Sequence, residues 1–102
     1  MSPNQRLRQD IHERFRQAFG MPDRAHGKDE QWSIKPCRQA IDIHVLVNGS
    51  VEIPAVWVFD PNDHNDGVSR LAIDEQEKID PVIQRIQQRI EAVKARYSSV
   101  ES

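Results

Sequence analysis

Ile41-Asp-Ile-His-Val-Leu-Val-Asn-Gly-Ser-Val-Glu-Ile-Pro-Ala-Val-Trp-Val-Phe59 is the stretch that decides the fold of this chain. Apolar residues alternate with other residues on both sides of the Asn48-Gly49 pair, which is the period of a β-strand with one buried face. Asn-Gly between two such runs is the strongest short-range signal for a β-hairpin. We therefore predict a hairpin whose strands span about residues 40–47 and 51–59.

The length of the hairpin loop determines which residues share a face. A two-residue turn would place Val45 opposite the charged Glu52, and a shift by one residue turns every side chain over. A three-residue loop, built from a type I turn and a bulge, avoids this mismatch. We prefer the longer loop, which predicts one apolar face from Ile41, Ile43, Val45, Val47, Val51, Ile53, Ala55, Trp57 and Phe59.

The same register predicts a second face of mixed chemistry. Its apolar members are Leu46, Val56 and Val58, and its ionisable members are Asp42, His44 and Glu52. Pro54, which has no N–H to donate, belongs to this face and predicts an edge strand or a bend. We do not expect a face that is half apolar and half ionisable to contact water alone, so it should also contact another part of the protein or another molecule.

Two amphipathic helices are expected on either side of the hairpin. The first spans about residues 3–19, with Ser2 as its cap, Pro3 in its first turn and Gly20 as its stop. Its apolar stripe consists of Leu7, Ile11, Phe15, Ala18 and Phe19. The second spans about residues 80–98, with Asp80 as its cap. Its apolar seam has helical spacings of four and three and consists of Ile79, Ile83, Ile86, Ile90, Val93 and Tyr97.

These elements predict a two-layer α+β fold in a single domain, residues 1–102. An antiparallel sheet of three to four strands, centred on the hairpin, carries both helices on its apolar face. Short strands are expected at 32–35 and 68–73, and a loop is expected at 20–31. The C-terminal seam packs on this sheet or pairs with a second subunit, and the sequence leaves both options open.

Composition narrows the classes of function. The chain carries 14 basic and 16 acidic residues, a net charge of -2, which disfavours nucleic-acid binding through the arginines of the helices. No apolar run approaches the ~20 residues that a membrane-spanning helix needs. One cysteine, Cys37, and an N-terminus without a secretory pattern predict a cytoplasmic protein.

The candidate ligand site lies on the second sheet face. Asp42, His44 and Glu52 place an imidazole among carboxylates, an arrangement used in general base catalysis and in metal binding. His64, in the polar loop 60–67, would add a second imidazole nitrogen. That loop fails the calcium-binding pattern, because Ile73 stands where a bidentate glutamate is required. We expect no metal and no cofactor.

The sequence therefore favours a small, non-enzymatic interaction module, with a second copy of the chain or another protein as its partner. The predicted interface uses either the second sheet face or the C-terminal seam. Its candidate residues are Leu46, Val56, Val58, Ile86, Ile90, Val93 and Tyr97. The alternative is a small-ligand or metal-dependent site on Asp42, His44 and Glu52, with loop 60–67 as its lid.

Overall fold

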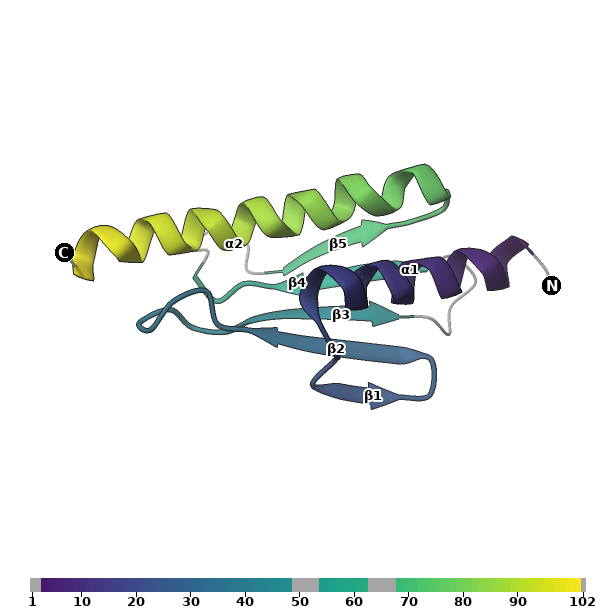
Figure 1. Ribbon diagram of the computed structural model, residues 1–102, viewed down its shortest axis with the longest axis horizontal. Coiled ribbons are helices and arrows are strands. Elements are labelled where there is room, and N and C mark those ends of the chain that lie inside the picture. The colour runs from purple at the N-terminus through teal and green to yellow at the C-terminus, as the bar shows by residue number, and fades with distance from the viewer. Residues whose placement is uncertain (1–2, 49–53, 63–67, 102) are drawn as a thin grey trace.

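A computed structural model describes residues 3–48, 54–62 and 68–101 of the chain. It consists of two α-helices, one 3-10 helix and five strands (Figure 1). In chain order these are α1 Pro3–Phe19, β1 Arg24–His26, β2 Asp29–Ile34, β3 Ile43–Asn48, β4 Ala55–Phe59, β5 Val68–Ala72, η1 Gln76–Lys78 and α2 Ile79–Glu101. Both α-helices lie on the same side of the sheet, so the α+β class with terminal helices is confirmed.

The sheet is a meander in which every strand pairs with its neighbours in the sequence. The strand order is β1-β2-β3-β4-β5, and each of the four pairs is antiparallel. The sheet therefore has five described strands rather than the predicted three to four. The strand missed by the prediction is β1, whose three side chains are all exposed and so lack an apolar alternation.

Helix α1 has the bounds that its sequence predicts. Its stripe of Leu7, Ile11 and Phe15 is buried against the sheet. Gly20 adopts a φ of 83° directly after the helix, and its N–H donates to the carbonyl of Arg16 at 2.8 Å. A positive φ suits glycine, which has no Cβ to clash, and this geometry closes the helix at the predicted residue.

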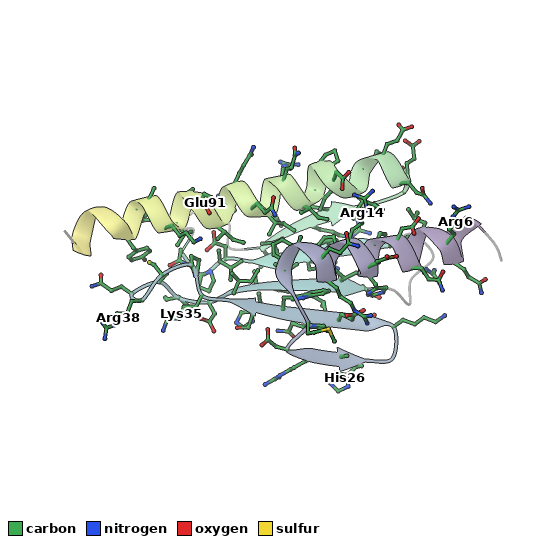
Figure 2. The ribbon with its side chains drawn as sticks, in the orientation of Figure 1. Arg6, Arg14, His26, Lys35, Arg38 and Glu91 are labelled. Carbon is green, nitrogen blue, oxygen red and sulfur yellow. The ribbon has the colours of Figure 1, made fainter. Side chains whose placement is uncertain are left out.

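Helix α2 begins at Ile79, one residue before the predicted start, and continues to Glu101. Asp80 therefore lies within its first turn, where it accepts a hydrogen bond at 2.7 Å from Arg14 of α1. Arg14 is labelled on α1 in Figure 2. The seam of α2 packs on the chain's own sheet. Its buried members are Ile79, Ile83, Ile86, Ile90 and Val93, with Tyr97 partly buried against the same core.

The register of the central hairpin differs from the prediction. Val45 pairs with Val58 and Val47 pairs with Val56, so 49–54 connect the paired positions Asn48 and Ala55. The preferred three-residue loop is therefore wrong. Residues 49–53, which include the Gly49 turn position as well as Val51, Glu52 and Ile53, lie outside the described residues.

This register turns strand β4 over relative to its predicted orientation. Val56 and Val58 face the helices and are buried, whereas Trp57 is partly exposed and Phe59 is 38% exposed on the opposite side. The odd-numbered residues of β3 face the helices as predicted, and Ile43, Val45 and Val47 are buried. Ile41 precedes β3 and is 57% exposed, so its predicted place in the apolar face is also wrong.

The core lies between the inner sheet face and the two helices. Trp32 of β2 is fully buried beside Phe15, and its indole N–H donates to the carbonyl of Gly20 at 2.8 Å. Pro54 is buried just before β4, and its carbonyl accepts the N–H of Ile73 beyond β5. The first contact holds the segment that leads into β1, and the second holds the residue that follows β5.

Candidate functional site

We call the side of the sheet that faces away from α1 and α2 the outer sheet face. Two rows of paired residues cross it from strand to strand. One row is Gln31, Leu46, Trp57 and Arg70, and the other is Ser33, His44, Phe59 and Val68. In the described part of the chain, both α-helices lie on the opposite side of the sheet and neither covers this face (Figure 1).

The centre of the outer sheet face is apolar. Leu46 and Trp57 are partly buried there, and Phe59 and Val68 are 38% and 41% exposed. The guanidinium of Arg70 lies 5.6 Å from the ring centre of Trp57, within the range of a cation–π contact. Arg24 of β1 pairs with Gln31 at the other end of the same row. The face therefore combines an apolar centre with arginines on its outermost strands.

Of the candidate ligand residues, His44 belongs to the second row of this face and Asp42 directly precedes β3, and each has a partner that the prediction did not include. His44 Nδ1 lies 3.3 Å from the amide nitrogen of Gln31, and Asp42 accepts a hydrogen bond from the hydroxyl of Ser33 at 2.8 Å. Glu52 and His64 lie outside the described residues. Within the described residues, no three acidic, histidine or cysteine side chains gather as metal ligands would.

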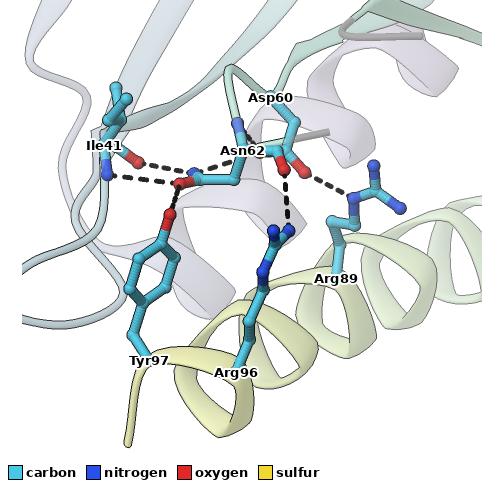
Figure 3. A network of polar contacts seen from close by, with 6 residues as sticks. All are labelled: Ile41, Asp60, Asn62, Arg89, Arg96 and Tyr97. Atoms are coloured by element: carbon cyan, nitrogen blue, oxygen red, sulfur yellow. Dashed lines mark hydrogen bonds and ion pairs between the residues drawn. The ribbon is translucent and has the colours of Figure 1, made fainter. Parts of the chain in front are cut away.

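The start of the 60–67 loop is tied to α2 (Figure 3). Asp60 is buried and accepts hydrogen bonds from Arg89 and from the N–H of Asn62. Asn62 is buried as well, and its side chain bonds both the carbonyl of Ile41 and the hydroxyl of Tyr97. Residues 63–67 lie outside the described residues, so the predicted lid stays a prediction.

The predicted interface residues divide between two places in the fold. Leu46 lies on the outer sheet face. Five others are buried in the core between the sheet and the helices: Val56 and Val58 on β4, and Ile86, Ile90 and Val93 on α2. Tyr97 is partly buried, and its hydroxyl donates a hydrogen bond to the side chain of Asn62. The prediction assigned the residues of β4 to the wrong faces of the sheet. Trp57 and Phe59 lie on the outer sheet face, where Val56 and Val58 were predicted.

Sequence reasoning missed a buried ionic cluster between α1 and β2. Glu30 is 4% exposed, and Arg16 binds its carboxylate with two hydrogen bonds of 2.9 and 3.0 Å. His12 Nδ1 lies 2.7 Å from the same carboxylate. A signal was present: Glu30 alternates with Trp32 and Ile34, and His12 and Arg16 are one helical turn apart. The prediction assigned residues 20–31 to a loop, so Glu30 was not recognised as part of a strand with one buried face.

Comparisons with protein-family models, with curated proteins and with solved structures found no match for this chain. Among the described residues, neither helix combines the length and the apolar character needed to cross a lipid bilayer. The functional argument therefore depends on the surfaces of the molecule itself.

Proposed function

We propose that this chain is a non-enzymatic interaction module that pairs with a second copy of itself through the outer sheet face. The observation that carries the proposal is the uncovered apolar centre formed by Leu46, Trp57, Phe59 and Val68. Removing these side chains from water is favourable, and a second identical face offers a matching apolar centre.

The polar surroundings of this centre agree with a protein interface. Interfaces that form between independently folded chains have an apolar core with a polar rim, and tryptophan and arginine are enriched among the residues that contribute most. Trp57 and Arg70 already contact each other here, and Arg24 lies on the strand at the opposite edge of the sheet. Arginines at the rim remain hydrated while the centre is covered.

The size of the face sets the expected strength of the dimer. Five strands about 4.8 Å apart, with about five residues each at about 3.3 Å per residue, give roughly 400 Å² in projection. Stable interfaces bury about 800 Å² per partner, so the predicted dimer is weak and depends on concentration. Packing of two sheets face to face at about 10 Å is the geometry expected for it.

The C-terminal seam does not support the same role, because its isoleucines and Val93 already form the chain's own core. The alternative of a small-ligand or metal site on Asp42, His44 and Glu52 receives no favouring observation. The described members of that set bond Ser33 and Gln31, and the carboxylate of Glu52 lies outside the described residues.

Sedimentation velocity over a range from micromolar to millimolar protein tests the proposal. We expect the wild-type chain to shift from monomer to dimer as the concentration rises. Phe59→Glu places a charge in the apolar centre and is expected to keep the chain monomeric throughout. A wild-type chain that stays monomeric at the highest concentration would overturn the proposal.

Met21→Glu is the matched control, because Met21 is 77% exposed and lies in the segment between α1 and β1 instead of in a strand of the sheet. This variant is expected to dimerise like the wild type. Equal dimerisation of the Phe59→Glu and Met21→Glu variants would assign the interface to another surface. Circular dichroism of both variants confirms that each remains folded.

A further inference from the structure

Strand β5 is the longer of the two edge strands of the sheet. It has five residues and β1 has three, and in the described part of the chain no strand pairs with the outer side of β5. Natural edge strands are protected from pairing with other chains by prolines or by charged side chains. β5 contains no proline, and the guanidinium of its one charged residue, Arg70, lies over the ring of Trp57 in β4 instead of extending beyond the edge.

The hydrogen bonds near the end of β5 indicate which backbone groups face the open edge. The N–H of Ile73, directly after β5, donates to the carbonyl of Pro54 at 2.9 Å, so this N–H points toward the β4 side. Backbone groups alternate in direction along an antiparallel strand, so every second residue before Ile73 also bonds β4. The N–H and C=O groups of Arg70 and Ala72 therefore point away from the sheet, and both residues are exposed.

A small groove lies on the helix side of β5, between this strand and α2. Its volume is about 140 Å³, which is below the range of small-molecule sites but leaves room for a side chain. Leu71 and Ile86 give it an apolar part, and Ser69 contributes a hydroxyl. Side chains alternate between the two faces of a strand, so a strand added to β5 would direct every second side chain toward this groove.

The α2 side of this groove is positively charged. Arg85 and Arg89 both line it, and residues four apart lie above one another on one side of a helix. The acids Asp80 and Glu91 of α2 do not line the groove, since Asp80 bonds an arginine of α1 and Glu91 bonds Lys94. The side of α2 that faces β5 therefore carries cations without an acid of the same helix.

Arg85 is the cation that this groove leaves available. Among the described residues that line it, the one carboxylate belongs to Asp60, which is buried and already accepts a hydrogen bond from Arg89. Arg85 is exposed and makes no ion pair or hydrogen bond within the described part of the chain. A carboxylate brought into the groove would therefore meet a guanidinium that has no competing acceptor.

We propose that the outer edge of β5 binds an extended acidic segment of a partner protein as an additional strand. Such a strand pairs with the outward N–H and C=O groups of Arg70 and Ala72, and this main-chain pairing supplies affinity for an extended chain. The groove supplies selectivity, because a carboxylate side chain there can accept paired hydrogen bonds from Arg85. The proposal is independent of dimerisation, since two sheets packed face to face leave their edges open.

Calorimetric titration with three blocked hexapeptides tests this proposal at fixed ionic strength. In each peptide valine alternates with a second residue, which is glutamate, glutamine or lysine. We expect the valine–glutamate peptide to bind, the valine–glutamine peptide to bind more weakly and the valine–lysine peptide not to bind. N-methylation of every peptide nitrogen of the valine–glutamate peptide should abolish its binding, because the added strand then has no N–H to donate.

Amide hydrogen exchange provides a readout that attraction between charges alone would not change. The exchange of the Arg70 and Ala72 amides, measured by NMR, should slow when the valine–glutamate peptide binds, because both N–H groups gain acceptors. Ala72→Pro removes one of these outward N–H groups, which the pairing with β4 does not use. We expect this variant to remain folded and to lose peptide binding.

Arg85→Gln is expected to weaken binding of the valine–glutamate peptide by about tenfold, the loss expected for one charge-assisted contact. Arg38→Gln is the matched control, since Arg38 is exposed, lies between β2 and β3 and does not line the groove (Figure 2). This control should bind the peptide like the wild type. Equal weakening by the two substitutions would contradict the proposal.

The proposal also fails if the valine–glutamate peptide does not bind, if the valine–glutamine peptide binds equally well, or if N-methylation leaves binding unchanged. Binding without slower exchange of the Arg70 and Ala72 amides would assign the peptide to another surface. The wild type should bind the peptide both below and above the protein concentration at which it dimerises. Dimerisation and peptide binding can therefore fail separately.

Discussion

Asp60 and Arg89 are joined by a hydrogen bond of 2.5 Å between a buried carboxylate and a half-exposed guanidinium (Figure 3). Asp60 follows directly after β4, and Arg89 lies in the middle of α2. The other carboxylate oxygen of Asp60 accepts the N–H and the side-chain amide of Asn62. This carboxylate therefore connects the end of β4 to the long helix α2.

Asp60→Asn is expected to lower the free energy of unfolding by about 2 kcal/mol, because a hydrogen bond to a charged group contributes about 1.5–3 kcal/mol. The new amide group would direct N–H toward the N–H of Arg89 or of Asn62. Urea denaturation followed by circular dichroism measures the change. Asp74→Asn, the same substitution at an exposed residue, is the control and should change the free energy of unfolding far less.

The exposed pair Asp74 and Lys78 gives a small dependence of stability on pH. The hydrogen bond from Lys78 holds the pKa of Asp74 below its ordinary value of 3.8. The same bond raises the pKa of Lys78 above its ordinary value of 10.5. The pair therefore contributes fully between these two values, and the contribution disappears as the pH falls through the pKa of Asp74 or rises through that of Lys78.

We therefore expect the melting temperature of the wild type to exceed that of Asp74→Asn slightly at neutral pH and low salt. The difference should vanish in strong acid, where both chains are uncharged at residue 74, and it should shrink with added salt. Differential scanning calorimetry of both chains over a pH series measures it. A difference that grows on acidification would contradict the assignment of this ion pair.

The orientation of β4 can be tested with the same substitution on both faces of the sheet. Val56→Ala is expected to lower the free energy of unfolding by about 2 kcal/mol, because it removes two methyl groups from a buried site. Val68→Ala is expected to cost less than about 0.5 kcal/mol, since Val68 is 41% exposed on the outer sheet face. Equal costs at the two positions would contradict the register of β4.

The cluster of Glu30 and Arg16 should respond asymmetrically to neutral substitutions. Arg16→Gln deprives the buried carboxylate of the two hydrogen bonds that Arg16 donates, and we expect it to cost about 2 kcal/mol. Glu30→Gln removes the negative charge that faces Arg16 and His12 but keeps one amide oxygen as an acceptor, and Arg16 is half exposed and can bind water instead. Its cost is expected to be about 1 kcal/mol. Guanidinium denaturation of the two variants would contradict this account if Glu30→Gln proved the more damaging.

Much of the fold was accessible from local patterns. The spacing of Leu7, Ile11 and Phe15 predicts α1 with its observed bounds, and the seam from Ile79 to Val93 predicts most of α2. Both patterns repeat over several turns, so they identify one buried face without reference to any other element. The alternation around Asn48 similarly predicts the central hairpin, although it does not determine which residues pair.

The candidate site was harder to predict from the sequence. A strand that carries apolar residues on both faces can turn either face toward the helices. Val56 and Val58 compete with Trp57 and Phe59 for the covered side of β4, and the sequence gives each set a period of two. The short strand β1 and the partners of Glu30 depend on contacts between segments that are distant along the chain. Local periodicity carries no information about such contacts.

The amino-acid sequence by itself determined that two amphipathic helices flank an antiparallel sheet, because helical and extended periodicities are properties of neighbouring residues. Only the tertiary structure decided which side of the sheet those helices cover. The pairing of Val47 with Val56 moves Trp57 and Phe59 to the uncovered side, and the pairing of Glu30 with Val47 places Glu30 on the covered side, next to Arg16 and His12. These choices depend on how well side chains from separate elements fill a shared interior, which no single segment specifies.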